Sequence, residues 1–376
     1  MKIGVNATYL IPGAVGGTEI YLRHLLQALA ESNGGHHYEV LINRESEGTQ
    51  LAPVAPGIVE RPTGVPARSR PLRILWEQTV LPWLSRQYDV LFNPGFTAPW
   101  FGPVPSVTTF HDLQYRQHPE YFRPLDRWAW RVVLDRVAAH SARIVCISET
   151  TRQAFLRFYP EAASRTVRVY SGVDPQFFTL PWRPDRQRPY LLSVATLHPH
   201  KNLLRLLRAF ATFRRAVTEA RLVLAGMRGF ASHAVASAIR ELHLEAAVEI
   251  PGWLPRRELY ALYQGAWALV APSRYEGFGL PVLEALAMGV PVICSSIPVF
   301  RELAADAVWY FDPDSDQQLC DAIARIWQDE ALRQRLSASG PGRARSFRWE
   351  ATATAMVEVF AAAASQEVRA RAVHGN

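Results

Sequence analysis

The sequence predicts an α/β protein with two domains, each a doubly wound parallel sheet with helices on its faces. Short β-branched, apolar runs alternate with helical patterns along the chain, which is typical of parallel sheets. The 376 residues suit two ordinary domains better than one. The alternation is interrupted once, by a Pro- and Arg-rich stretch over 172–189. We interpret this stretch as the interdomain linker.

The first half contains six predicted strands separated by helical patterns. Leucines and Ile20 form an apolar helical stripe over 20–29, and Ser148 suits the N-cap of a helix after the fifth strand. The predicted strands are Lys2–Asn6, Tyr38–Ile42, Tyr88–Phe92, Ser106–Phe110, Arg143–Ile147 and Thr166–Tyr170.

The second half repeats the pattern, with helices expected from Asn202 and over His233–Leu242. We therefore expect domains over 1–175 and 176–348, and a C-terminal helix in 349–376 that packs back across the domain junction. Ligands of open parallel sheets bind beyond the carboxyl ends of the strands, so site residues are sought there. The predicted strands are Tyr190–Val194, Arg221–Ala225, Val248–Ile250, Trp267–Ala271 and Pro291–Cys294.

Charge and cysteine content exclude several classes of protein. The net charge of +7 is spread over the chain, with 18 basic and 15 acidic residues in 1–175 and 23 and 19 in the rest. This lacks the dense basic tract of a nucleic-acid binder. The three cysteines show neither a disulfide framework nor zinc-ligand spacing. The start of the chain lacks a signal-peptide core, so a cytoplasmic protein is expected.

One segment, Arg61–Arg73, carries four arginines, three prolines and no acid. We interpret it first as a solvated loop. Contact with anionic lipid or with a phosphorylated acceptor is the second interpretation.

The strongest constellation of residues follows the strand Trp267–Ala271. Glu276 and Glu284 are separated by seven residues, and Pro281 suits the first position of a short helix that stops at Gly289. The loop backbone at Gly277, Phe278, Gly279 and Leu280 can approach a ligand closely. Unpaired amides at this helix start form an anion site suited to a diphosphate, and we assign them to Gly279, Leu280, Val282 and Leu283.

The two glutamates are expected to have different roles. Glu284, placed in the first turn, would be repelled by phosphate, so ribose hydroxyls are its expected ligands. Glu276, in the loop before the helix, can face the sugar hydroxyls. Taken singly, Glu284 could merely stabilise the helix dipole and Glu276 could be a solvated acid. Their combination with the glycines and the proline favours a donor site.

Lys201 follows the strand Tyr190–Val194 and is one of only two lysines, against 39 arginines. A lysine where arginine is the usual cation indicates a need for a compact point charge. We therefore predict that Lys201 binds phosphate.

The 276–284 segment, followed by Ala-Leu-Ala-Met-Gly-Val-Pro-Val, closely resembles the E-x7-E signature of retaining glycosyltransferases of the GT-B fold (family 4, group 1). The resemblance covers nearly the whole chain. It implies two facing Rossmann-like domains and a lysine that neutralises the donor diphosphate. Relatives often carry an arginine six residues before this lysine, where this chain has Ala195. We expect Thr196, His198 or His200 to replace that cation in part.

In the first domain, Gly16 and Gly17 precede a helix and permit close approach of phosphate or sugar. The loop matches neither a dinucleotide fingerprint nor a P-loop. His111 follows the strand Ser106–Phe110, with Asp112 beside it. The family has a His-Asp pair at this place near the transferred sugar, so the resemblance implies a catalytic role for His111.

Specificity for the donor and the acceptor is expected from segments with weaker sequence signals. Gly252 and Trp253 follow a strand and are candidates for contact with the donor base. The stretch from His111 to Glu120 resembles mannosyltransferases of bacterial surface-polysaccharide assembly, which implies GDP-mannose. We interpret Trp128, Trp130, Arg127 and Arg131 first as parts of a buried amphipathic helix. Contact with a lipid-linked glycan at the inner face of the membrane is the second interpretation.

The resemblance implies front-face displacement, in which the donor phosphate helps to take the acceptor proton. Catalysis then depends on positioning and on stabilising the leaving diphosphate, with Lys201, Glu276 and His111 as catalytic residues. We expect no metal and no cofactor, because the nucleotide sugar is a substrate. The alternatives are a UDP-sugar-dependent transferase, a nucleotide-sugar epimerase, and a nucleotide-sugar-binding protein without activity.

Overall fold

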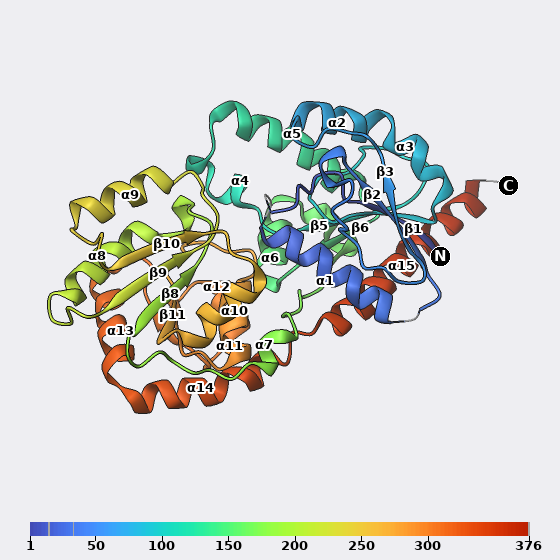
Figure 1. Ribbon diagram of the computed structural model, residues 1–376. Coiled ribbons are helices and arrows are strands. Elements are labelled where there is room, and N and C mark those ends of the chain that lie inside the picture. Colours follow the sequence, from blue (N-terminus) through green and yellow to red (C-terminus); the bar gives the residue numbers. More distant parts are fainter. Residues whose placement is uncertain (14–15, 33, 375–376) are drawn as a thin grey trace. The chain divides into compact units, whose positions relative to one another are not determined.

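A computed structural model describes residues 1–13, 16–32 and 34–374, and divides into two compact units (Figure 1). Unit 1 comprises Met1–Gly172 together with the chain from Trp349 onward, and unit 2 comprises Val173–Arg348. Each unit is built on its own open parallel sheet with flanking helices. The predicted fold class is confirmed.

Unit 1 contains a seven-stranded sheet with the order β3-β2-β1-β4-β5-β6-β7. Every neighbouring pair is parallel. The central strands are almost entirely buried, as expected for a parallel sheet covered on both faces. The strands are β1 (Lys2–Asn6), β2 (His37–Ile42), β3 (Ile58–Pro62), β4 (Val90–Asn93), β5 (Ser106–Phe110), β6 (Arg143–Cys146) and β7 (Thr166–Arg168).

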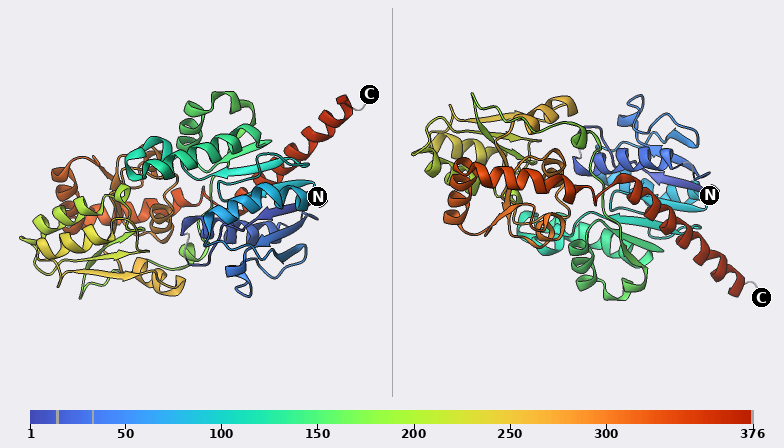
Figure 2. Two further views of the ribbon diagram at one scale, coloured as in Figure 1. Left: turned by 90° about the horizontal axis from the view of Figure 1, so that it is seen from above. Right: turned by 90° about the horizontal axis from the view of Figure 1, so that it is seen from below.

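Helices cover both sides of this sheet, with α15 packed on α1 and on strands β4 and β5. Figure 2 shows α15 running along unit 1 in both views. The hydroxyl of Ser148 accepts a hydrogen bond from the Thr151 amide at 2.9 Å, which confirms the predicted N-cap. The helices are α1 (Gly17–Glu31), α2 (Arg70–Thr79), α3 (Leu81–Leu84), α4 (Gln114–Gln117), α5 (Pro124–His140), α6 (Glu149–Phe158) and α15 (Trp349–His374).

Unit 2 contains a six-stranded sheet with the order β10-β9-β8-β11-β12-β13, again parallel throughout. Its core joins strand residues to apolar faces of α8 and α13, with Phe210 and Ile323 fully buried. The strands are β8 (Tyr190–Val194), β9 (Arg221–Ala225), β10 (Val248–Gly252), β11 (Ala268–Ala271), β12 (Val292–Ser295) and β13 (Trp309–Phe311).

The helices of unit 2 follow its strands in regular alternation. Helix α11 packs against α14 and α7, and α8 packs against α13 and α9. The helices are α7 (Gln176–Thr179), α8 (Leu203–Arg214), α9 (Ser232–Glu241), α10 (Arg256–Gly265), α11 (Leu280–Met288), α12 (Pro298–Ala304), α13 (Asp316–Gln328) and α14 (Glu330–Ala344). Within the described part of the chain, none of the helices is long and apolar enough to cross a membrane.

Strand order reverses once in each sheet, between β1 and β4 in unit 1 and between β8 and β11 in unit 2. In open α/β sheets, a ligand crevice forms at this switch point, at the carboxyl ends of the strands. In unit 2, the loops that follow β8 and β11 carry Lys201 and Glu276. The fold therefore places both side chains at the expected binding edge.

The solvated loop expected over Arg61–Arg73 is confirmed for residues 63–69 and wrong at both ends. Its first residues belong to β3, and its last residues begin α2. Arg73 is buried and forms a 2.7 Å ion pair with the equally buried Glu77. A carboxylate one helical turn away explains how this arginine is accommodated inside the unit.

Candidate active site

The loop after β8 turns sharply before α8 begins. Residues Pro199–Lys201 form a single 3-10 turn, and Asn202 adopts the left-handed conformation with a φ of 58°. The amide of Arg274 donates a hydrogen bond of 2.8 Å to the carbonyl of His200. This bond fixes the loop after β8 against the loop after β11.

Lys201 and Glu276 meet across these two loops. The ammonium of Lys201 lies 2.7 Å from both carboxylate oxygens of Glu276, and the hydroxyl of Ser273 donates to Oε1 at 2.8 Å. Both charged side chains are largely buried, with 17% and 15% exposed. They line a narrow pocket together with Gly279 and Pro281. A buried cation, a carboxylate and a helix start therefore share one crevice.

Gly279 at the entrance of α11 has a φ of 120°, which side chains rarely adopt. A Cβ there would also lie 2.8 Å from the ring of Phe300. The amides of Val282 and Leu283 donate to the Gly279 carbonyl. The anion site expected from four amides is therefore reduced to those of Gly279 and Leu280.

The loop before α11 also contains Gly277 and Phe278. The side chain of Phe278 is buried and packs edge-to-face on Phe347, with ring centroids 6.1 Å apart. The ring of Phe278 is thus turned into the unit and does not take part in the predicted contact with a donor.

Glu284 differs from its predicted placement. It is the fifth residue of α11, one turn beyond the helix start, and it is buried. Its Oε2 accepts a 2.8 Å hydrogen bond from the Tyr263 hydroxyl, and its Oε1 lies 3.2 Å from the Arg256 guanidinium. Unlike Glu276, it does not line the pocket that holds Lys201.

Arg256 extends this network to Asp174. Its guanidinium contacts the Asp174 carboxylate, which also accepts a hydrogen bond from Tyr260. Burial alone would raise the pKa of Asp174, but the bonds from Arg256 and Tyr260 lower it on balance. Glu284 raises the pKa of Arg256 against the opposing effect of burial. One partly buried arginine therefore compensates two buried carboxylates, as a buried charge requires.

The loop that carries Lys201 also contains Thr196, His198 and His200. Burial, followed by the Lys201 charge, lowers the pKa of the neighbouring His198. The His198 ring stacks on His200 with centroids 5.7 Å apart. Thr196 lies in the same loop, and its carbonyl accepts from the His198 amide. All three residues expected to compensate for Ala195 therefore lie in the same loop as Lys201, but none of them lines the pocket that holds Lys201.

Gly252 and Trp253 lie at the end of β10, two strands away from β8. Gly252 has a φ of 81°, and its carbonyl accepts a hydrogen bond from Gly226. Trp253 is half exposed. They share the binding edge of the sheet with Lys201 but belong to a different part of it.

In unit 1, Gly16 caps α1 with a φ of 63°, and space is open around Gly17. His111 directly follows β5 and is buried, and its Nε2 donates a 2.6 Å hydrogen bond to the Pro94 carbonyl. Burial lowers the pKa of His111 to about 4, so the ring is neutral near pH 7.

An Asp-x-Asp-x-Asp sequence, Asp312 to Asp316, lies between β13 and α13. Its last two carboxylates are neutralised by arginines, with Arg205 contacting both. Across 1–13, 16–32 and 34–374, the structure groups no three His, Cys, Asp or Glu residues as a metal site.

Four residues of the site were missed by sequence reasoning: Ser273, Asp174, Arg256 and Tyr263. The contacts of Asp174, Arg256 and Tyr263 join segments far apart in the chain, and no motif marks Arg256 or Tyr263. Asp174 fell within the expected linker. Only Ser273, three residues before Glu276, carried a local signal.

Comparison with known proteins gives the same class as the fold. Residues 15–177 match the family described as Glycosyltransferase Family 4, and residues 180–343 match Glycosyl transferases group 1. O-antigen chain mannosyltransferase B of Escherichia coli is 30% identical over 294 residues, which are 74% of this chain and 76% of that protein. Glycogen synthase of Mycobacterium tuberculosis is 26% identical, over 94% and 92% of the two chains.

The solved structure of sucrose-phosphate synthase from Thermosynechococcus elongatus superposes with a TM-score of 0.76 at 21% identity, covering 96% of this chain and 98% of that one. This likeness shows the shared GT-B fold. The two sheets and the two matched regions define a glycosyltransferase. The chain belongs to the GT-B glycosyltransferases, with a family 4 region followed by a group 1 region.

Proposed function

We propose that this glycosyltransferase moves a hexose from a nucleoside-diphosphate sugar to a glycan or lipid-linked glycan, with retention of anomeric configuration and without a metal ion. The first candidate is mannose from GDP-mannose, in surface-polysaccharide assembly at the cytoplasmic membrane face. The observation that carries the proposal is the Lys201–Glu276 pair beside the start of α11. Similarity to an O-antigen mannosyltransferase supports the choice of sugar.

The proposed donor site assigns each group by its charge. Lys201 and the amides of Gly279 and Leu280 bind the diphosphate, because an ammonium and a helix N-terminus both favour anions. Glu276 then releases Lys201 and accepts hydrogen bonds from the sugar hydroxyls. Glu284, held by Arg256, accepts hydrogen bonds from ribose.

The proposed site includes further residues of both units. Thr196, His200 and the backbone of Gly277 and Phe278 border the diphosphate, and Gly252 with Trp253 contacts the base. For unit 1, we propose that Gly16, Gly17 and His111 take part in sugar transfer, with the neutral His111 ring as a hydrogen-bonding group.

In the proposed reaction, the acceptor hydroxyl attacks C1 from the side on which the diphosphate leaves. The C1–phosphate bond breaks, the glycosidic bond forms, and the acceptor proton passes to the departing phosphate oxygen. Lys201 stabilises the negative charge that develops on the leaving group. The protein contributes position and charge, with no covalent intermediate.

A thermal-shift series with GDP-mannose, UDP-glucose and ADP-glucose tests the donor assignment, since a ligand that binds the folded state raises the Tm. GDP-mannose is expected to give the largest shift, and a larger shift with UDP-glucose or ADP-glucose would reject it. Turnover in EDTA, with the product anomer read by NMR, tests the chemistry. Conversion of the donor sugar without an acceptor would identify an epimerase, and binding without conversion an inactive protein.

A further inference from the structure

Helix α5 carries apolar residues on two opposite sides. Leu134 and Val137 are buried in the unit 1 core, as expected of a covering helix. Leu125, Trp128 and Val132 occupy the other side, at the spacing i, i+3, i+7 that forms a stripe. Leu125 is 75% exposed and Trp128 is 64% exposed. The outer stripe therefore has no partner in the described structure.

The neighbouring elements extend this exposed apolar surface. Leu72 and Leu75 on α2 are more than half exposed, Trp83 on α3 is 63% exposed, and so is Phe101. Together with the outer stripe of α5, these residues form what we call the α2–α5 face. These seven residues are half of the fourteen large apolar side chains that the described structure exposes.

Three contacts show that the elements adjoin. The guanidinium of Arg70 lies over the ring of Trp130 at 5.0 Å, which joins α2 to α5. The Phe101 ring contacts His140 at the end of α5, with centroids 6.4 Å apart. The Trp100 amide donates to Gln78 of α2 at 2.9 Å. Figure 1 shows α5, α2 and α3 along the upper edge of unit 1.

The same elements are strongly basic. Asp126 is exposed, whereas Asp135 is paired with Arg116 and with Arg131, and Glu77 is buried with Arg73. Exposed arginines far outnumber these acids, so the face is cationic as well as apolar. The exposed arginines are Arg68, Arg70, Arg86, Arg123, Arg127, Arg131 and Arg136.

We propose that the α2–α5 face docks unit 1 on the surface of an anionic phospholipid bilayer. Tryptophan and leucine side chains enter the boundary between headgroups and acyl chains, while arginines bind lipid phosphates. This deepens the peripheral membrane contact in the proposed function, on which it rests, by naming the surface and the lipid charge. A second copy of the chain fits this face poorly, because a twofold contact would set arginines against arginines.

Sedimentation with lipid vesicles tests the proposal without donor or acceptor. We expect the protein to sediment with vesicles of 70% phosphatidylcholine and 30% phosphatidylglycerol, and only weakly with pure phosphatidylcholine. Raising the salt concentration should reduce binding, because surface charge is screened. Donor affinity is measured separately, so failure of vesicle binding leaves the donor site untouched.

Three double variants separate the apolar and charged contributions. W83S/W128S should abolish most binding, whereas W83F/W128F should retain most of it. R127Q/R131Q should lower affinity by roughly fivefold for each arginine and weaken the salt dependence. The matched controls are V54S and R157Q, which alter an exposed valine and an exposed arginine elsewhere on unit 1.

Two results would overturn the proposal. One is absence of wild-type binding to anionic vesicles at low salt, with the protein folded by circular dichroism. The other is binding that V54S or R157Q reduces as much as W83S/W128S does. Light scattering of the lipid-free protein tests whether a second copy of the chain binds this face. A wild-type dimer that W83S/W128S dissociates would assign the face to self-association instead.

Discussion

The ammonium of Lys201 lies 2.7 Å from each carboxylate oxygen of Glu276, in a pocket at the start of α11. Each group neutralises the other in a largely buried position, where an isolated charge would be costly. A diphosphate entering this pocket would compete with Glu276 for the same cation. The ion pair therefore keeps both charges compensated until an anion displaces Glu276 from Lys201.

Lys201→Ala should weaken nucleoside-diphosphate binding by one to two orders of magnitude, because a charge-assisted bond contributes about 1.5–3 kcal/mol. Calorimetric titration with GDP and UDP measures the loss. The matched control is Lys2→Ala, since Lys2 is the only other lysine in the sequence and lies on β1 of unit 1. Equal affinity in K201A and wild type would remove Lys201 from the donor site.

Glu276→Gln should affect binding of the nucleoside diphosphate and binding of the sugar differently. Binding of a free nucleoside diphosphate is expected to hold or tighten, since a neutral amide competes less for Lys201. The additional affinity for the sugar-bearing donor and the rate of transfer should both fall. Titration with GDP and GDP-mannose measures this split.

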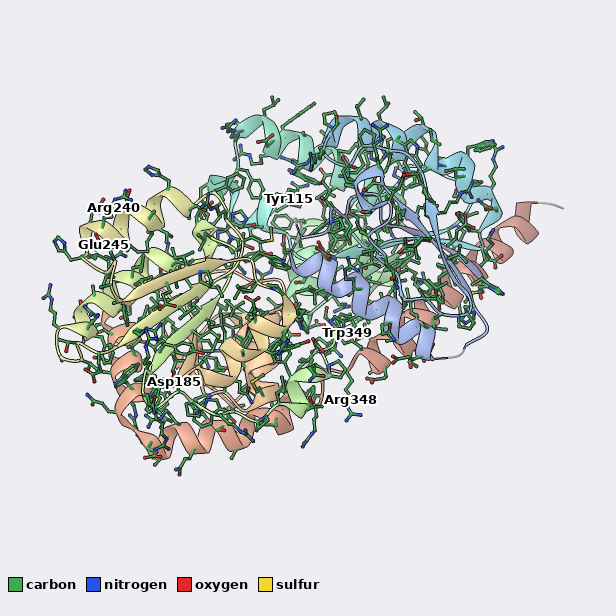
Figure 3. The ribbon with its side chains drawn as sticks, viewed as in Figure 1. Tyr115, Asp185, Arg240, Glu245, Arg348 and Trp349 are labelled. Atoms are coloured by element: carbon green, nitrogen blue, oxygen red, sulfur yellow. The ribbon has the colours of Figure 1, made fainter. Side chains whose placement is uncertain are left out.

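The control for lost negative charge is Glu245→Gln, an exposed acid beyond α9 in unit 2 (Figure 3). A loss of GDP affinity in E276Q as large as that in K201A would instead make Glu276 a residue that positions the lysine.

Tyr263→Phe should loosen the carboxylate of Glu284, because the phenol donates a 2.8 Å hydrogen bond to it. We expect a stability loss of about 1–2 kcal/mol and a weaker affinity for the nucleoside part of the donor. Chemical denaturation and nucleoside titration measure the two effects. In the control Tyr310→Phe, the lost hydroxyl bonds the carbonyls of Phe300 and Ala305. Nucleoside affinity lowered equally in both variants would show that Glu284 does not bind the donor.

The buried His111 should make stability depend on pH. Burial depresses its pKa from 6.5 to about 4, so below pH 6.5 the unfolded chain takes up a proton that the folded chain does not. The free energy of unfolding should therefore fall between pH 6.5 and 4, by up to about 3 kcal/mol from this group. Denaturation of His111→Gln across this range should show a shallower fall. His233→Gln, at an exposed position on α9, should leave the slope unchanged.

The three cysteines should differ in reactivity toward a thiol reagent. Cys146 and Cys294 are fully buried, and burial raises the pKa of each thiol, which lowers the thiolate fraction. Cys320 is partly exposed on α13. One thiol per folded chain should react rapidly, and Cys320→Ser should abolish that reaction. Rapid labelling of two or three thiols in folded protein would contradict the burial.

The central strands were predictable because parallel strands buried on both faces form continuous apolar runs, as in Tyr190–Val194. The strands β3 and β13 were missed although the other two edge strands, β7 and β10, were predicted, so their own sequences are the cause. The sequence of β3, Ile-Val-Glu-Arg-Pro, has no such run, and β13 is only three residues long.

At the site, local sequence was informative where loops follow strands directly. Lys201 and Glu276 could be identified because each lies just after a strand, and the strand order then brings them together. The partners of Glu284 could not be predicted, since Arg256 and Tyr263 reach it from another helix. Its burial likewise depends on packing of α11 that no local spacing encodes.

The chain leaves unit 1 after Gly172 and re-enters it at Trp349, and these crossing points adjoin. A Cβ on Gly172 would lie 2.4 Å from the Trp349 nitrogen, and the Val173 amide donates to the Phe347 carbonyl at 3.0 Å. Trp349 in turn stacks on His24 of α1 (Figure 3). Unit 2 is thus an insertion in the chain of unit 1, and the chain enters and leaves unit 2 at neighbouring points. A stop codon at position 349 would remove α15. This helix follows unit 2 in the sequence, but its loss would affect unit 1, of which it is a part.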